Sequence, residues 1–263
     1  MYMYETIIYE VKNNVATITI NRPDVSNAFS LKTYSEVKIA LELSGKDAEV
    51  RAVVITGSGK NFSAGGDVNR FKTLIETEEF LPPEGVIAAG AMTRAVKLCP
   101  KPVVAKINGV AAGAGCSLAL ACDFRVMDEK SKLAMAFINM GFSGDTGGIY
   151  FLNRMVGTAK TTEMLVLAEP VKAQEAHALG LTTKLGKEGE LDTTTTELIE
   201  KLLQKPTQAI AKQKALNYEF FFSDLEQFNE REAQYMVECG KTKDHQEAVY
   251  AFLEKRKPNF TGK

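Results

Sequence analysis

The chain has 263 residues, of which 45% are hydrophobic and 25% are charged, as in ordinary soluble globular proteins. This apolar content excludes a mainly disordered chain, and no apolar run reaches the roughly 18 residues of a membrane-spanning helix. Lys and Arg number 32 against 33 Asp and Glu, so the net charge of -1 excludes a general attraction to nucleic acid or anionic membranes. The first residues lack a signal-peptide pattern, and we therefore expect a cytoplasmic protein.

Strand and helix patterns alternate over residues 1–190, which predicts an α/β core. Short apolar or alternating runs predict strands at 6–11, 15–20, 51–57, 101–109, 124–127 and 132–136. Helices are predicted at 31–44, 84–98, 115–122, 147–156 and 173–179. Between the first two strands, Asn13 and Asn14 predict a hairpin turn.

The last third of the chain has only helical patterns, at 193–203, 207–218, 224–239 and 245–255, with no strand after about residue 186. We therefore expect residues 191–263 to form a helical C-terminal region on the core. An isolated small appendage would not bury all of its aromatic side chains, which include Phe220, Phe221, Phe222 and Phe228. This surplus favours association between copies of the chain. The competing interpretation is that these rings pack wholly on their own core.

Several common chemistries do not fit the sequence. With two histidines, and four cysteines that form no CxxC pair, we expect no metal site and no thioredoxin-type redox pair. The segment GSGK at 57–60 fails the P-loop pattern at Val54 and Asn61. The segment GAGCSL at 113–118 has Leu118 where a dinucleotide-binding fingerprint has its third Gly, so a nicotinamide dehydrogenase is a weak alternative.

Two Gly-rich turns each follow a buried strand and precede a helix. They are NFSAGGDV at 61–68, where Asp67 suits the cap of a helix starting near residue 68, and INGVAAGAGCSLALACD at 107–123. Each alone is more typical of a tight turn than of a site. A helix N-terminus presents unpaired N–H donors, and two such turns can place two donors on one oxygen. This is the physical requirement of an oxyanion hole.

A third turn, MGFSGDTGGIYFLNRMVG at 140–157, places Asp145 between glycines just before a predicted helix. From the local sequence alone, the favoured role of Asp145 is that of a helix cap.

These three motifs occur in a specific order along the chain. FSAGGD at 62–67, ING…GAGCSLALACD at 107–123 and GFSGDTGG at 141–148 together resemble the crotonase superfamily, the enoyl-CoA hydratase/isomerase family. NRPDVSNAFS at 21–30 is similar to the early CoA-binding turn of that family, and AFLEKRKPNF at 251–260 is similar to its ending. The resemblance covers nearly the whole chain.

The resemblance implies a crotonase-like spiral of ββα units, followed by a helical C-terminal region used to form trimers or hexamers. It implies an acyl-CoA substrate, and no cofactor beyond the CoA of that substrate. It assigns the two oxyanion-hole N–H groups to Gly66 and Ala114, and adenine contact to the backbone around Ala64. The positions it assigns to substrate and CoA binding are Val25, Ala28, Ala64, Gly66, Asp67 and Ala114.

The acid–base positions depart from the hydratase pattern. The two glutamates of typical hydratases are replaced by Ser117 and Phe137. Asp145 instead matches the acid of the double-bond isomerases, whose motif reads G-L-x-P-D-x-G-G, and the phenylacetate-pathway enoyl-CoA isomerases look most similar. Phe142 and Gly144 stand for the Leu and Pro of that motif, and the missing Pro predicts a less rigid loop.

One carboxylate suits a 1,3-proton shift, whereas hydration needs two acid–base roles around a water molecule. We therefore predict an enoyl-CoA isomerase with Asp145 as its base, in an apolar pocket that raises its pKa. Phe137, Ile138 and Met140 are candidates for that pocket, although each is individually more typical of a simple core residue. The alternatives are an enoyl-CoA hydratase in which Asp145 has another partner, and a non-catalytic acyl-CoA-binding homologue.

Overall fold

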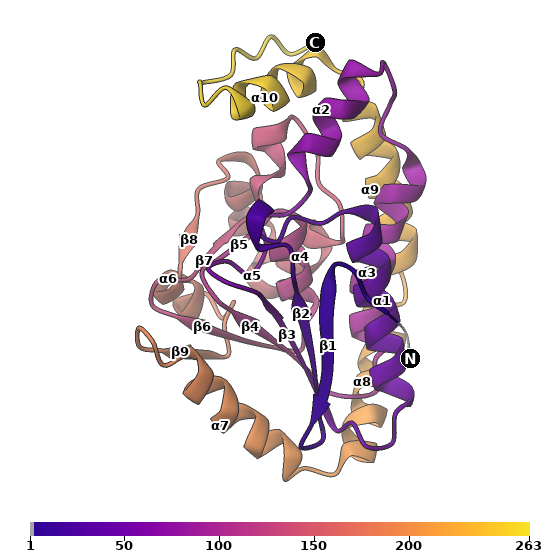
Figure 1. Cartoon of the computed structure of the whole chain (residues 1–263), viewed down its shortest axis with the longest axis vertical. Helices are drawn as coiled ribbons and strands as arrows, with labels where there is room; N and C mark the ends of the chain where they lie inside the picture. The colour runs from indigo at the N-terminus through magenta and orange to yellow at the C-terminus, as the bar shows by residue number, and fades with distance from the viewer. Residues whose placement is uncertain (1–2) are drawn as a thin grey trace.

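The computed structural model describes residues 3–263 and contains two sheets (Figure 1). The larger sheet has the order β1-β2-β3-β4-β6-β9. Its strands are β1 (Ile7–Lys12), β2 (Val15–Ile20), β3 (Ala52–Gly57), β4 (Val103–Ile107), β6 (Phe124–Asp128) and β9 (Lys184–Gly186). The smaller sheet has the order β5-β7-β8, formed by β5 (Val110–Ala112), β7 (Lys132–Ala134) and β8 (Val171–Lys172).

The predicted hairpin is confirmed, because β1 and β2 are antiparallel and Lys12 pairs with Val15. The two turn residues between them, Asn13 and Asn14, have φ angles of 51° and 63°, the conformation that two-residue hairpin turns require. The remaining neighbours in the larger sheet are parallel. Every residue of β3 is buried, as expected for a strand covered on both faces.

A repeated ββα unit builds the core. In one unit β4 and β5 are followed by α4 (Ala114–Ala121), and in the next β6 and β7 are followed by α5 (Gly148–Val166). The first strands of the two units pair in the larger sheet, and the second strands pair in the smaller sheet. This repetition, with the helices at the C-terminal end, confirms the predicted spiral of ββα units.

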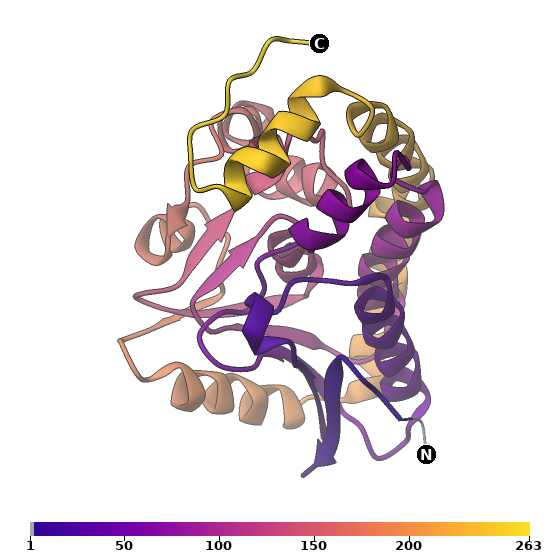
Figure 2. The same ribbon diagram turned by 45° about the horizontal axis from the view of Figure 1, so that its top comes forward.

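The remaining helices cover the two sheets. They are α1 (Leu31–Lys46), α2 (Val68–Glu76), α3 (Pro83–Leu98), α6 (Ala173–Ala178), α7 (Leu191–Leu203), α8 (Thr207–Phe221), α9 (Leu225–Cys239) and α10 (Lys243–Leu253), with short 3-10 helices η1 (Pro23–Val25) and η2 (Ala136–Met140). Helix α3 packs against α1, α8 and α9, whereas α7 packs on strands of the larger sheet. Figures 1 and 2 both place α10 beside α2.

Some predicted boundaries change for local reasons. Helix α5 continues past residue 156 to Val166, because the chain kinks at Gly157 (φ 74°) and resumes a second helical segment. The strand predicted at 132–136 ends at Ala134, because the 3-10 helix η2 begins at Ala136. In the C-terminal region, Phe222 and Phe228 pack against the main core, whereas Phe220 and Phe221 are 68% and 64% exposed. None of the described helices is both long and apolar enough to cross a membrane.

A buried carboxylate ties the start of the chain to α1. Glu36 is 2% exposed and accepts hydrogen bonds from the Glu5 N–H (2.9 Å), the Thr6 N–H (2.8 Å) and the Thr6 hydroxyl (2.6 Å). Burial alone would raise the pKa of Glu36, but these donors, with Lys32 nearby, outweigh burial and lower it.

A buried cation holds the far end of α4. Arg125, on β6, is 7% exposed, and its guanidinium donates to the carbonyl oxygens of Cys122 (2.6 Å) and Leu181 (2.7 Å). Longer contacts reach the carbonyl oxygens of Ala119 and Leu120, in the last turn of that helix. Arg125 therefore satisfies carbonyl groups that the helix cannot satisfy itself.

Candidate active site

A cavity of about 460 Å³ opens where η1, the turn before α2, the start of α4 and the loop before α5 meet. It is lined by all seven residues that the sequence assigned to substrate binding or catalysis, namely Val25, Ala28, Ala64, Gly66, Asp67, Ala114 and Asp145. Apolar side chains form much of the remaining wall, including Phe71, Leu81, Val86, Phe137, Met140, Phe142 and Met236. The structure therefore brings together residues spread over 120 positions of sequence, between 25 and 145.

The early turn is organised by Asn27, a residue that was not predicted to matter. Asn27 is fully buried with a φ of 58°, a conformation that Asn tolerates better than most residues. Its amide group donates to the carbonyl oxygens of Ser58 (2.8 Å) and Asn61 (2.7 Å), and its side-chain oxygen accepts from the Arg22 N–H (3.0 Å). These bonds fix the turn that carries Val25. The signal available in the sequence was an Asn within a short polar turn.

The carboxylate of Asp67 joins two turns at the cavity. It caps α2 by accepting from the Asn69 N–H (3.2 Å), as predicted, and it also pairs with Arg22 at 2.9 Å. The same guanidinium donates to the Ala28 carbonyl oxygen at 2.5 Å. Asp67 thus holds the early turn against the start of α2, while its contact with CoA stays a prediction.

The two Gly-rich turns pack directly against each other. The Ser63 N–H donates to the Val110 carbonyl oxygen (3.1 Å), and the Ala112 N–H donates to the Ser63 carbonyl oxygen (2.9 Å). Next to this bridge, Gly65 has a φ of 92°, and a Cβ there would lie 2.8 Å from the Ala112 oxygen. Only glycine permits this approach without displacement of the neighbouring turn.

This packing leaves two backbone donors free at the cavity. Among the described residues, neither the Gly66 N–H nor the Ala114 N–H has a hydrogen-bond partner. Ala114 is the first residue of α4, where N–H groups have no partner within the helix. Free N–H groups of this kind stabilise negative charge that develops on an oxygen between them.

Asp145 is a buried carboxyl group of the cavity wall. It is 5% exposed, and its side chain accepts a hydrogen bond from the Thr146 hydroxyl at 2.9 Å. Burial raises the pKa of Asp145 to about 6, and the Thr146 hydrogen bond opposes part of this rise. A carboxyl group with this pKa is largely ionised at neutral pH and is a stronger base than an exposed Asp.

The helix-cap interpretation of Asp145 is wrong. Helix α5 begins at Gly148, and its N-cap position is occupied by Gly147 in the left-handed conformation, without a side-chain cap. The Asp145 carboxylate therefore lies outside the capping position, and only its backbone carbonyl contacts the Gly148 N–H, at 3.3 Å.

Two helices hold the loop that carries Asp145. The loop contains four residues with positive φ, namely Gly141 (66°), Gly144 (121°), Thr146 (59°) and Gly147 (72°). From α3, the Thr93 hydroxyl donates to the Thr146 carbonyl oxygen at 3.0 Å. From α9, Glu232 accepts from the Gly147 N–H at 2.7 Å. The sequence predicted a less rigid loop here, because Gly144 replaces the Pro of the isomerase motif. The two contacts anchor this loop from outside, and neither was predicted.

The other sequence-predicted positions divide between cavity and core. The Ser117 hydroxyl is fully buried and donates to the Gly113 carbonyl oxygen (3.2 Å), so it lies inside α4 rather than in the cavity wall. Phe137 and Met140 line the cavity, but Ile138 does not and is 42% exposed. The reason is the 3-10 helix η2, in which residues three apart share a face and Ile138 falls on another.

Neither histidine lies in the cavity wall. His245 contacts the Met140 carbonyl oxygen at 2.7 Å and packs on the Phe142 ring, with the ring centroids 4.2 Å apart. His177 lies on α6, away from these elements. Residues 3–263 contain no group of three or more His, Cys, Asp or Glu able to hold a metal ion.

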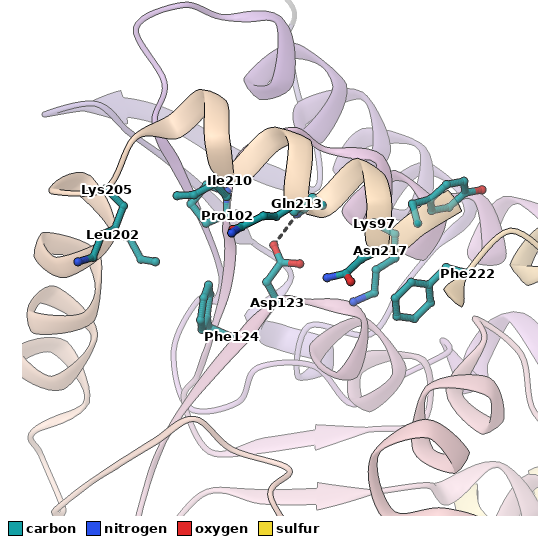
Figure 3. A pocket seen from close by; sticks show the side chains of 12 residues that line it. Lys97, Pro102, Asp123, Phe124, Leu202, Lys205, Ile210, Gln213, Asn217 and Phe222 are labelled. Carbon is teal, nitrogen blue, oxygen red and sulfur yellow. Dashed lines mark hydrogen bonds and ion pairs between the residues drawn. The ribbon is translucent and has the colours of Figure 1, made fainter. Parts of the chain in front are cut away.

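A second cavity, of about 420 Å³, lies between α3, α7, α8 and the start of β6 (Figure 3). Its lining includes Asp123, which pairs with Lys214 at 2.5 Å, but none of the seven residues assigned from the sequence. Of these two cavities the first is therefore the candidate active site, since it combines the free N–H groups with a buried carboxyl group.

Comparisons with known proteins identify the family. The model of the enoyl-CoA hydratase/isomerase family matches residues 10–263. A crotonyl-CoA hydratase of Syntrophomonas wolfei is 35% identical over 263 residues, which cover 99% of each chain. A 1,2-epoxyphenylacetyl-CoA isomerase of Escherichia coli is 31% identical, over 99% of this chain and 100% of the other.

The fold leads to the same family. The crystal structure of an enoyl-CoA hydratase from Mycobacterium avium subsp. paratuberculosis matches with a TM-score of 0.90 and 30% identity, over 98% of this chain and 100% of that chain. With the family model, the relatives and the fold in agreement along almost its entire length, the chain belongs to the enoyl-CoA hydratase/isomerase family.

Proposed function

We propose that this protein moves a carbon–carbon double bond in an enoyl-CoA, with Asp145 as the only acid–base group. The observation that carries the proposal is the set of carboxyl groups in the cavity wall. The described part of the chain contributes three carboxyl groups to this wall. Asp24 is exposed, Asp67 is paired with Arg22, and Asp145 is buried without a cation partner. One base free to exchange a proton is what a 1,3-shift requires.

The proposed reaction starts with the thioester oxygen between the N–H groups of Gly66 and Ala114. The Asp145 carboxylate takes a proton from the α carbon of a 3-enoyl thioester, and the electrons move onto the thioester oxygen to form a dienolate. The resulting carboxylic acid then returns the proton to the γ carbon, which gives the 2-enoyl thioester and restores the carboxylate. Because no water is consumed and no electrons are gained or lost, the reaction needs no cofactor beyond the CoA of the substrate.

Hydration is the second candidate, since a crotonyl-CoA hydratase is among the relatives. Addition of water needs one group to activate the water and another to deliver a proton. In this chain the two hydratase glutamate positions hold a buried serine bonded to Gly113 and a phenylalanine of the cavity wall. This arrangement favours isomerisation.

A single assay separates the candidates. Purified protein is given a 3-enoyl-CoA and, separately, the matching 2-enoyl-CoA, and the products are identified by mass spectrometry in H₂O and in D₂O. We expect conversion between the two enoyl esters, with deuterium entering at the α or γ carbon. A 3-hydroxyacyl-CoA as the main product would support the hydratase, and neither product nor exchange, despite CoA-ester binding, would support a non-catalytic homologue.

We also propose that copies of this chain associate as a trimer or a pair of trimers. The supporting observation is the exposed aromatic surface of α8, where Phe220 and Phe221 are 68% and 64% exposed. Exposed rings of this size are characteristic of surfaces covered by a partner. Light scattering should give three or six times the chain mass of 28.8 kDa, and the mass of a single chain would contradict the proposal.

A further inference from the structure

Glu232 is a buried carboxyl group outside the cavity that the proposed reaction does not use. It lies on α9, is 6% exposed, and accepts the Gly147 N–H at 2.7 Å through Oε2. Its other oxygen, Oε1, has no hydrogen-bond partner in the described part of the chain. Burial of a carboxyl group that makes only one hydrogen bond destabilises the folded protein. We therefore ask what Glu232 does at this position.

The bond to Gly147 acts on the turn that carries the base. The partner of Glu232, Gly147, follows Asp145 by two positions in the chain. Thr146, which lies between them, and Gly147 have positive φ angles of 59° and 72°. For a non-glycine residue such as Thr146 this conformation is unfavourable and persists only where neighbours enforce it. The bonds from Thr93 and Glu232 are the contacts that enforce it here.

The surroundings of Glu232 favour its uncharged form. Burial, together with the charge of Asp145, raises the pKa of Glu232 to about 8, against the lowering effect of the Gly147 N–H. Cations on the packed helices are engaged elsewhere: on α3, Arg94 pairs with Glu226 and Lys97 faces the Phe151 ring, and on α5 Arg154 pairs with Asp224. In its uncharged form Glu232 can still accept the Gly147 N–H through a carboxyl oxygen.

We propose that Glu232 is a positioning residue for Asp145, acting as an uncharged carboxylic acid that fixes the Gly147 N–H and places no second negative charge beside the base. The inference rests on the proposed function, since Asp145 must be the base for its position to matter. Glu232 does not line the cavity, so its effect on the reaction passes entirely through the Asp145 loop.

Three substitutions test this role. Glu232→Gln keeps the size, the accepting oxygen and the lack of charge, and should keep kcat within about 3-fold of the natural protein. Glu232→Leu removes the acceptor and leaves the Gly147 N–H unpaired, and should lower kcat at least 10-fold. Glu232→Asp is one methylene too short to reach Gly147, and should also lower kcat. Because the cavity wall is untouched, KM should change by less than about 3-fold in all three.

The matched control is Glu36→Leu, which removes a second buried glutamate that does not line the cavity. It should lower the melting temperature but leave kcat per folded enzyme unchanged, so a general loss of packing is separated from a loss of positioning. If Glu232→Leu does not fold, Glu232→Asp takes its place. Unchanged kcat in the Leu or Asp variant, or an equal loss in the Gln variant, would overturn the inference.

The failure of this inference is distinguishable from failure of the proposed function. Asp145→Asn is measured beside the Glu232 variants with the same 3-enoyl-CoA. Activity that survives Asp145→Asn contradicts the proposed function itself. An inactive Asp145→Asn together with a fully active Glu232→Leu contradicts only the positioning role of Glu232.

Discussion

Two regions of this molecule bury carboxyl groups in opposite ways. Around Glu36, the N–H groups of Glu5 and Thr6 are used to satisfy the carboxylate, and the pKa of Glu36 falls. Around the cavity, the N–H groups of Gly66 and Ala114 stay free, while burial raises the pKa values of Asp145 and Glu232. Hydrogen bonds thus satisfy the buried charge of Glu36, whereas the cavity keeps two free N–H donors and a buried carboxyl group without a cation.

The largest expected effect comes from removal of the proposed base, Asp145, at the cavity. Asp145→Asn keeps the size of the side chain but cannot accept a proton, so isomerisation should slow by roughly 100-fold or more. CoA-ester binding should be nearly unchanged. The folded state favours the uncharged acid, because the pKa of Asp145 is raised from 3.8 to about 6. The Asn variant should therefore melt no lower than the natural protein at pH 8.

Next in size is the loss of a free donor. Gly66→Pro removes one N–H and should lower kcat by roughly 100-fold to 1000-fold, the scale of one oxyanion-hole donor. Gly66→Ala is the matched control, since its Cβ would meet the Phe71 ring at 3.0 Å but its N–H remains. Equal activity in the two variants would show that this donor does not bind the thioester oxygen.

The pH dependence of kcat/KM should report the raised pKa of Asp145. Below about pH 6 the carboxyl group of the free enzyme is protonated, so kcat/KM should fall about tenfold per pH unit. A profile that stays flat down to pH 5 would assign the base to a group other than Asp145.

The smallest expected effect concerns how the two buried glutamates contribute to the free energy of unfolding. Because the folded pKa of Glu36 is lowered, its contribution is present above its ordinary value of 4.5 and is lost as pH falls through the folded pKa. Glu36→Gln should therefore destabilise the protein at pH 7, by about 1 to 3 kcal/mol. The measurement is urea unfolding.

Glu232 should show the opposite sign in the same experiment. Its folded pKa is raised from 4.5 to about 8, so its contribution is fully present below pH 4.5 and is lost as pH rises from there through about 8. Glu232→Gln stays uncharged and should be more stable than the natural protein at pH 9. Destabilisation by both glutamine variants at pH 9 would remove the distinction between the two regions.

Much of the fold and cavity was predictable because local patterns carry them. The hairpin at Asn13 and Asn14, the buried strand at 51–57 and the Gly-rich turns depend on neighbours in sequence, and the motif order then placed Gly66, Ala114 and Asp145 at one cavity. The helix-cap interpretation of Asp145 failed because the left-handed Gly147 shifts the start of α5 to residue 148.

Residues that act across the fold could not be predicted in this way. Glu232 stands in a stretch of charged residues, NEREAQ, that is typical of a solvent-exposed helix face. Its burial follows from the packing of α9 against α3, which brings it to a loop 85 residues earlier. The role of Asn27 likewise depends on carbonyl groups more than 30 residues away.

The binding of Arg125 to the end of α4 has an electrostatic consequence at the opposite end of that helix. Aligned peptide dipoles place about half a positive charge at a helix N-terminus and half a negative charge at its C-terminus. The guanidinium of Arg125 neutralises the negative end of this eight-residue, wholly buried helix. The positive end, at Ala114, then acts uncompensated on the cavity, where a negatively charged oxygen gains about 0.3 to 2 kcal/mol from such a field.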